Sequence, residues 1–167
     1  MSALSIRAAE AGDAAAMAAI FREGIEDRTA TFETVPASEA EMAALAGADA
    51  PVLVAERAGE VVAWVKVGAY ANAHDYYASV GEATLYVARR ARRRGIGLAL
   101  LTAIADAAEH AGYHKLVGKV FTANRASIEL LRRCEWREVG VHRRHGRLDG
   151  EWRDVLVVER LLGNAAV

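Results

Sequence analysis

Residues 81–108 read GEATLYVARRARRRGIGLALLTAIADAA and change character twice along their length. The apolar run 83–87 predicts a β-strand. After a segment crowded with arginine come Gly95 and Gly97, and the next residues repeat apolar side chains at helical spacing. The arginines are Arg89, Arg90, Arg92, Arg93 and Arg94, and the apolar stripe of the helix is Leu98, Leu101, Ala105 and Ala108. The stretch therefore predicts a strand, a basic glycine turn and a helix.

The junction between this strand and this helix is suited to an anion. The first amides of a helix have no partner within the helix, and the helix dipole leaves that end partly positive. Gly95 and Gly97 have no side chain that would hold a phosphate away from the backbone, and the arginines add positive charge. We therefore predict a ligand that carries phosphate.

Spacing narrows the kind of phosphate site. The P-loop pattern requires a lysine after its second glycine, and Leu98 follows Gly97. A Rossmann fingerprint requires a third glycine, where Leu100 stands. A run of arginines is also typical of a solvated face or a nucleic-acid patch. The chain balances 21 Lys and Arg with 22 Asp and Glu, so it lacks the excess positive charge that drives nucleic-acid binding. We favour ligand phosphate over a solvated face, and we expect no nucleic-acid partner.

Length and composition indicate one domain. The chain has 167 residues, of which 53% are hydrophobic, enough to bury a core, and we expect a domain over residues 1–163 with a short tail over 164–167. The single cysteine, Cys134, excludes an intrachain disulfide and a cysteine-based zinc site, and we expect no metal. The charged start does not fit a signal peptide, and the apolar run 96–105 is shorter than the roughly 20 residues that span a bilayer. We expect a cytoplasmic protein that does not bind membranes.

Apolar periods and turn signals predict the remaining elements. Asp13 is expected to cap the first helix, and Ser38 with Glu41 forms a capping-box pattern before the second. Asp149-Gly150 is a strong hairpin signal. The predicted strands are 4–8, 52–56, 61–67, 83–87, 115–121, 139–145 and 152–161, and the helices follow Asp13, Ser38, Gly97 and Asn124. The order β-α-α-β-β-β-α-β-α-β-β predicts a mixed sheet with helices packed on it.

Two motifs on this framework resemble those of the GCN5-related N-acetyltransferases (GNAT). Arg92-Arg93-Arg94-Gly95-Ile96-Gly97 fits their Arg/Gln-x-x-Gly-x-Gly/Ala signature, and Asn124-Arg125-Ala126-Ser127 is similar to the start of their second conserved helix. Within the superfamily, residues 24–34, Gly81-Glu82 and residues 142–155 (HRRHGRLDGEWRDV) resemble phosphinothricin and arsinothricin N-acetyltransferases. The resemblance implies an α/β (α+β) fold of GNAT type. Its mixed, mostly antiparallel sheet of about seven strands would be splayed between strands 4 and 5 and flanked by about four helices.

The same resemblance implies acetyl-coenzyme A as cosubstrate. Its pyrophosphate is expected on the basic glycine turn, its pantetheine arm beside Asn124, and its acetyl group against the backbone of residues 85–87, where an amide would stabilise an oxyanion. We interpret the Tyr86 side chain mainly as core. The residues implied to bind the cosubstrate are Leu85, Tyr86, Val87, Arg92, Arg93, Arg94, Gly95, Ile96, Gly97, Leu98, Ala99, Asn124 and Ser127.

Glu82 is the candidate catalytic residue, because the relatives are taken to use a carboxylate here as general base. An amine is an ammonium at neutral pH and attacks a thioester only after it loses a proton. Without the neighbouring glycine turn, Glu82 would be interpreted as an ordinary strand-edge residue. No cysteine stands near Glu82 in the sequence to carry an acetyl group, which favours a direct, sequential transfer. We identify no general acid.

The resemblance places a substrate pocket between the loop after the first helix, the loop before Glu82 and the last hairpin. The residues expected in its wall are Thr31, Phe32, His74, Tyr77, Arg144 and Arg147. Phe32 is equally compatible with the core, and His74 with an exposed loop. Arg144, His145 and Arg147 are compatible with the surface of a homodimer, because the relatives resemble two-fold dimers.

Several positions depart from the relatives, and two of them affect the expected substrate contacts and a helix end. An arginine is expected where His74 stands, and a neutral imidazole holds an acidic substrate less firmly than a guanidinium does. Glu135 stands where the relatives have glycine after a helix, and a left-handed backbone at a glutamate costs about 1 kcal/mol or more.

Three functions are compatible with these patterns. The first is acetylation of the α-amine of a small acidic amino acid analogue, such as phosphinothricin, arsinothricin or methionine sulfoximine. The second is acetylation of another amine, in a polyamine, an aminoglycoside or a protein N-terminus. The third is a non-catalytic acyl-coenzyme A-binding regulator, against which Glu82 argues.

Overall fold

The computed structural model describes residues 3–71 and 74–166, and its helices and strands follow the predicted order. The strands are β1 (Leu4–Ala8), β2 (Val52–Arg57), β3 (Glu60–Ala69), β4 (Val80–Val87), β5 (Lys115–Phe121), β6 (Arg137–Leu148) and β7 (Glu151–Leu161). The helices are α1 (Ala14–Asp27), α2 (Glu39–Ala46), α3 (Ile96–His110) and α4 (Arg125–Arg133). Within the two described ranges, no helix is long and apolar enough to cross a membrane.

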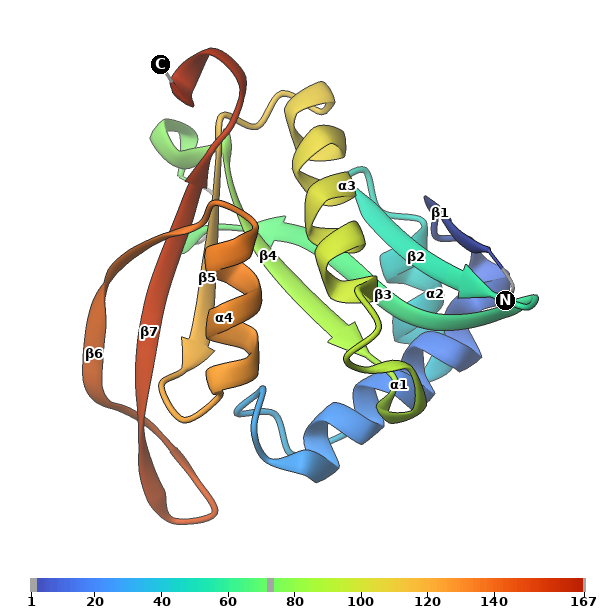
Figure 1. Ribbon diagram of the computed structural model, residues 1–167, viewed down its shortest axis with the longest axis horizontal. Coiled ribbons are helices and arrows are strands. Elements are labelled where there is room, and N and C mark those ends of the chain that lie inside the picture. The colour runs from blue at the N-terminus through green and yellow to red at the C-terminus, as the bar shows by residue number, and fades with distance from the viewer. Residues whose placement is uncertain (1–2, 72–73, 167) are drawn as a thin grey trace.

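The strands form one sheet in the order β1-β2-β3-β4-β5-β7-β6, in which β4 and β5 are the parallel pair and the other neighbours are antiparallel. β4 and β5 pair only between residues 80–82 and 115–117. Beyond Glu82 they diverge, although β4 continues to Val87 and β5 to Phe121 (Figure 1). The predicted mixed sheet and its splay between the fourth and fifth strands are therefore confirmed.

Helices cover both faces of the sheet: α3 and α4 lie on one face, and α1 and α2 on the other (Figure 1). Neighbouring residues of β4 point to opposite faces, as the period of a strand requires. Tyr86 packs on α1, where Gly24 leaves room for its ring, and Leu85 approaches α3 at Gly97. Buried side chains of α1, β3 and α3 join the layers into one core. Strand β4 therefore carries two different environments, one on each face.

Polar side chains at the starts of α1 and α2 behave differently. Ser38 and Glu41 form the predicted capping box before α2. The predicted cap at Asp13 is wrong, because its carboxylate accepts a hydrogen bond from the Glu10 amide and pairs with the Arg7 guanidinium at 2.7 Å. A cation is a stronger partner for a buried carboxylate than a helix amide is. Asp13 therefore ties β1 to the start of α1 and does not cap the helix with its side chain.

Two turns contain residues with positive φ at positions that the sequence analysis singled out. Asp149 and Gly150 both have positive φ, 51° and 81°, and connect β6 to β7 as the hairpin signal predicted. Glu135, just after α4, has a φ of 64°, so a glutamate does occupy the left-handed position where the relatives have glycine. The following Trp136 donates its backbone N–H to Leu131 and buries its side chain, which closes the helix end.

Candidate active site

A cavity of about 400 Å³ lies where β4 and β5 part. Its wall includes residues of both strands, of α3 and α4, of the loop between α1 and α2, and of the last two strands. Leu85 and Leu130 bound it on the face of α3 and α4, and Glu82 and Phe32 belong to the opposite side. Because the strands do not pair beyond Glu82, the cavity reaches both faces of the sheet.

Part of the predicted site lines this cavity and part does not. The predicted residues in its wall are Thr31, Phe32, Glu82, Leu85, Tyr86, Asn124 and Ser127. Those outside it are Val87, Arg92, Arg93, Arg94, Gly95, Ile96, Gly97, Leu98, Ala99, His74, Tyr77, Arg144 and Arg147. The expected base and the expected pantetheine contacts therefore gather at one place, whereas the expected pyrophosphate turn lies at the start of α3.

Glu82 is the acidic group of β4 in the cavity wall, and its side chain is 29% exposed. Its Oε2 atom lies 3.1 Å from Nζ of Lys119 on β5. Parallel pairing of Glu82 with Val117 sets this contact, because Lys119 follows two residues later on the same face of β5. The expected base therefore shares the cavity with a cation.

Asn124 caps α4 with its side chain. Its Oδ1 accepts a hydrogen bond from the Ser127 amide at 3.2 Å, and its Nδ2 donates to the carbonyl of Thr29 at 3.2 Å. The second bond ties the start of α4 to the loop that carries Thr31 and Phe32. Phe32 packs edge-on against Phe121 of β5, with ring centroids 4.7 Å apart. These contacts hold one wall of the cavity over the gap between the strands.

Tyr86 is mainly a core residue, as its strand position suggested. Its side chain packs against Phe21 and Trp64, with ring centroids 5.1 Å away in both cases. Burial raises the pKa of Tyr86, and its hydrogen bond to Thr31 opposes that rise only in part. The phenol therefore stays neutral at physiological pH and borders the cavity as an uncharged group.

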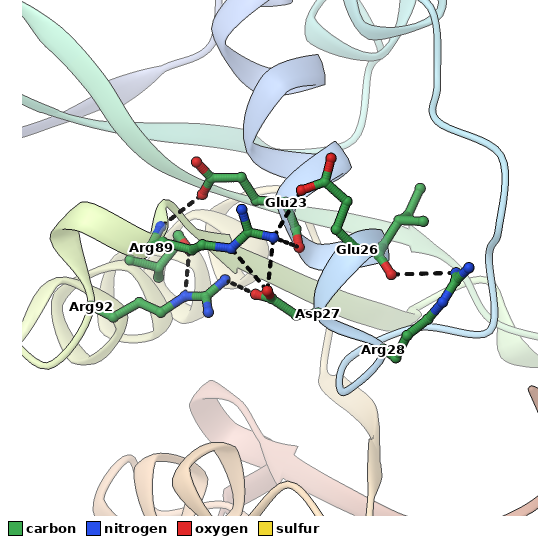
Figure 2. A network of polar contacts seen from close by, with 8 residues as sticks. Glu23, Glu26, Asp27, Arg28, Arg89 and Arg92 are labelled. Carbon is green, nitrogen blue, oxygen red and sulfur yellow. Dashed lines mark hydrogen bonds and ion pairs between the residues drawn. The ribbon is translucent and has the colours of Figure 1, made fainter.

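The basic turn before α3 is held by carboxylates of α1. Figure 2 shows Arg89 and Arg92 meeting the Asp27 carboxylate, at 2.8 Å and 2.7 Å. Burial alone would raise the pKa of Asp27, but the two arginines outweigh it and hold the pKa below its usual value. Arg93 and Arg94 have no ion-pair partner in the described part of the chain, and both are exposed. Part of the arginine cluster is thus structural, which the sequence did not reveal.

The two glycines of the turn have different surroundings. Gly95 precedes α3 with a φ of 78°, a backbone that favours glycine, and has open space around it. Gly97 lies inside the first turn of α3 and is buried. A Cβ at this position would lie 2.7 Å from a side-chain carbon of Leu130 in α4, which is too close. The helix was expected to begin after Gly97, but it begins two residues earlier, at Ile96. Gly97 allows close packing of α3 on α4, while Leu98, expected on the core stripe, is only half buried.

The remaining predicted substrate residues lie apart from the cavity. Asn72 and Ala73 of the predicted binding loop fall outside the described residues. His74 stacks on Tyr76, and Tyr77 packs against Tyr70 and Tyr76. On the hairpin, the Arg144 amide donates to Asp154, and the Arg147 guanidinium lies 4.4 Å from the ring centroid of Trp152. These positions are surface contacts in the described conformation.

The cavity wall also contains residues that were not expected there, among them Lys119, Trp136 and His145. Lys119 had a detectable signal, since it is a charged residue in the otherwise apolar second half of β5. Trp136 and His145 had none, because their approach depends on how α4 and the last hairpin fold back. A second hollow of about 420 Å³, at the far end of α3, contains none of the predicted site residues.

Comparisons with known proteins agree with this geometry. The family described as "Acetyltransferase (GNAT) family" matches residues 17–136. The sequence is 30% identical to a phosphinothricin N-acetyltransferase from Alcaligenes faecalis, over 96% of this chain and 83% of that protein. It is 32% identical to an L-methionine sulfoximine/L-methionine sulfone acetyltransferase from Pseudomonas paraeruginosa, over 93% of this chain and 92% of that protein.

Among solved structures, a GNAT superfamily phosphinothricin acetyltransferase from Sinorhizobium meliloti in complex with AcCoA superposes with a TM-score of 0.89. The two sequences are 30% identical, and the match covers 98% of this chain and 90% of that one. The family match spans more than half of the chain, and the sheet, its splay and its helices agree with it. The chain therefore belongs to the acetyltransferase (GNAT) family and is an acyltransferase enzyme.

Proposed function

We propose that this enzyme transfers the acetyl group of acetyl-coenzyme A directly to the α-amine of a small acidic amino acid analogue, with Glu82 as general base. The observation that carries the proposal is the position of Glu82, in the wall of the cavity at the point where β4 and β5 stop pairing. The relatives that act on phosphinothricin, methionine sulfoximine and methionine sulfone support the substrate class, to which we add arsinothricin.

Features of the chain fit acetyl-coenzyme A. The amides at the start of α3, with Arg93 and Arg94 beside them, suit a pyrophosphate. Residues 83–87 have no β5 partner, so their backbone can bind an extended arm that contains amides. Asn124, Ser127 and Leu130 of α4 border the same space. When bound there, the cosubstrate supplies an acyl group activated as a thioester.

The chain's own residues would then move one proton and stabilise one developing charge. A carboxylate oxygen of Glu82 would take a proton from the substrate ammonium, directly or through one water, and so free the amine's lone pair. A peptide amide of β4 beyond Glu82 would donate to the carbonyl oxygen as negative charge develops on it. Cys134 is buried directly after α4 and does not belong to the cavity wall, which favours direct transfer over an acetylated cysteine.

We also propose one domain over residues 1–163, a homodimer, and a cytoplasmic location without nucleic-acid or membrane partners. The buried free thiol of Cys134 fits a reducing compartment. The exposed Arg144 and Arg147 on the last hairpin are available to a second copy. Sedimentation at micromolar concentration would show whether the chain is a dimer.

The experiment that tests the enzyme activity is thiol release from acetyl-coenzyme A with a panel of amines. The panel contains phosphinothricin, methionine sulfoximine, methionine sulfone, arsinothricin, spermidine, an aminoglycoside and an alanyl peptide. We expect release with the acidic analogues and little with the cationic amines. Activity with spermidine or the peptide alone would refute the substrate class. Binding of acetyl-coenzyme A without release from any amine would refute the enzyme function proposed here.

A further inference from the structure

The contact between Glu82 and Lys119 brings two opposite charges into one cavity. Their charged atoms are 3.1 Å apart, and the two side chains are 29% and 47% exposed. A pair with this much access to water contributes little to folding, typically less than about 1 kcal/mol. The pair can therefore open when a ligand offers each charge a new partner.

Both side chains lie on the face of the sheet that is expected to receive the amine. Phe121 follows Lys119 by two residues and shares its face, and Phe32 covers Phe121. The other ionisable groups in the wall on this side are Glu33, on the loop, and His145, on β6, together with the neutral Tyr86. No arginine lines the cavity among the described residues. Among the described residues, Lys119 is therefore the one lysine or arginine of this wall.

We propose, resting on the proposed function, that Lys119 binds the α-carboxylate of the substrate while Glu82 receives its α-ammonium. An α-amino acid carries the two charges on one carbon, so they are about as far apart as the Glu82 and Lys119 atoms that they would replace. The exchange substitutes two intermolecular ion pairs for one intramolecular pair. The charges of the α-ammonium and the α-carboxylate cancel, so these two groups avoid the desolvation cost that accompanies an unpaired buried charge.

The same arrangement selects against amines that lack the carboxylate. Such an amine would place its ammonium beside Glu82 and leave Lys119 nearby without an anion, so the two cations would repel each other. Specificity of this kind comes from a repulsive contact as well as an attractive one. Lys119 would therefore determine the class of substrate, and Glu82 the chemistry.

The test compares L-methionine sulfone with 3-(methylsulfonyl)propan-1-amine, which is the same molecule without its carboxylate. Lys119→Met removes the cation, and Lys119→Arg keeps it. Lys66→Met is the matched control, because Lys66 lies on β3 outside the cavity wall and its removal changes net charge equally. Steady-state kinetics with acetyl-coenzyme A gives kcat and KM for each substrate.

We expect Lys119→Met to lower kcat/KM for methionine sulfone at least tenfold, mainly through KM, and to leave that for the decarboxylated amine unchanged or increased. Lys119→Arg should restore much of the preference, and Lys66→Met should not change it. Equal losses for both substrates would overturn the inference, since Lys119 would then only orient Glu82. An unchanged preference would also overturn it.

A failure of the proposed enzyme function would be recognised separately. If the wild-type protein binds acetyl-coenzyme A but acetylates neither compound, calorimetric titration of both compounds into the protein with coenzyme A tests the carboxylate contact without turnover. Tighter binding of methionine sulfone, lost at least tenfold in Lys119→Met, would support Lys119 as the anchor. Equal affinities in the two proteins would overturn it.

Discussion

Replacing Glu82 with glutamine tests the proposed base with little change in shape. The side chain keeps its length, and Lys119 loses its anion but remains about half exposed, so the cost to folding should not exceed about 1 kcal/mol. General-base catalysis contributes about 10²- to 10⁴-fold. The variant should lose that much in kcat, which corresponds to about 3 to 5 kcal/mol on the barrier. Affinity for acetyl-coenzyme A should stay within about twofold, since its expected contacts lie on α3, α4 and the other strand residues.

The assay is thiol release over pH 6 to 9 with the best acidic analogue, together with calorimetry of acetyl-coenzyme A and chemical denaturation. Without a base, only the free amine fraction reacts, so the residual rate should rise with pH until the substrate amine has lost its proton. Glu33→Gln is the matched control, because Glu33 also lines the cavity but lies on the loop beside Phe32. A Glu82→Gln protein with full rate across this range, or a Glu33→Gln protein with the same loss, would refute the assignment.

Three further predictions concern the surroundings of the site. Asp27→Asn should lower the free energy of unfolding by about 1 kcal/mol and weaken acetyl-coenzyme A binding severalfold, because Arg89 and Arg92 lose their shared anion. An unchanged affinity in calorimetry would show that the basic turn keeps its conformation without Asp27. Gly97→Ala should lower the free energy of unfolding by about 1 kcal/mol net, since overpacking against Leu130 outweighs the helix preference of alanine. In the Leu130→Ala background the same substitution should cost less in chemical denaturation, and an equal cost would exclude this contact as the cause. The hydrogen bond from the Arg7 side chain, opposed by burial, holds the pKa of Asp13 below its unfolded value. The stabilisation from Asp13 is therefore present above about pH 4 and is lost as pH falls through the native pKa. Urea denaturation between pH 5 and 2 should show a smaller loss of unfolding free energy in Asp13→Asn than in the wild type, and equal dependence on pH in the two proteins would contradict this linkage.

The order and most bounds of the elements could be predicted because they depend on local patterns. Alternating or continuous apolar runs located the strands, and the hairpin at Asp149 and Gly150 followed from residues that tolerate positive φ. The splay between β4 and β5 came from family resemblance instead, since no local pattern states where two parallel strands stop pairing. The same limit explains why the partner of Glu82 was missed: its contact with Lys119 depends on the register of two strands 37 residues apart in sequence.

Charged residues were the hardest to interpret, because a charge acquires its role from whatever faces it. Arg92 and Arg93 are neighbours in one basic run, yet Arg92 pairs with Asp27 while Arg93 has no ion-pair partner in the described part of the chain. Asp13 has the right position for a helix cap but lies against the cation of β1. In each case local sequence gave the correct element and the wrong partner, since ion pairs form between segments that only the tertiary fold brings together.

The gap in the sheet gives a physical reason why this fold suits the proposed transfer. β4 turns Glu82 toward the face of α1 and Leu85 toward the face of α3, so the expected proton acceptor and the expected thioester site belong to opposite sides of one strand. In a fully paired sheet the backbone between them would be hydrogen bonded and closed. Where β5 departs, the amides of β4 are freed and the two sides meet in one cavity, so an amine and a thioester can approach each other without sharing an entrance. On this reasoning, a disulfide or salt bridge engineered to hold β5 against residues 84–86 should abolish transfer while leaving both outer surfaces of the protein intact.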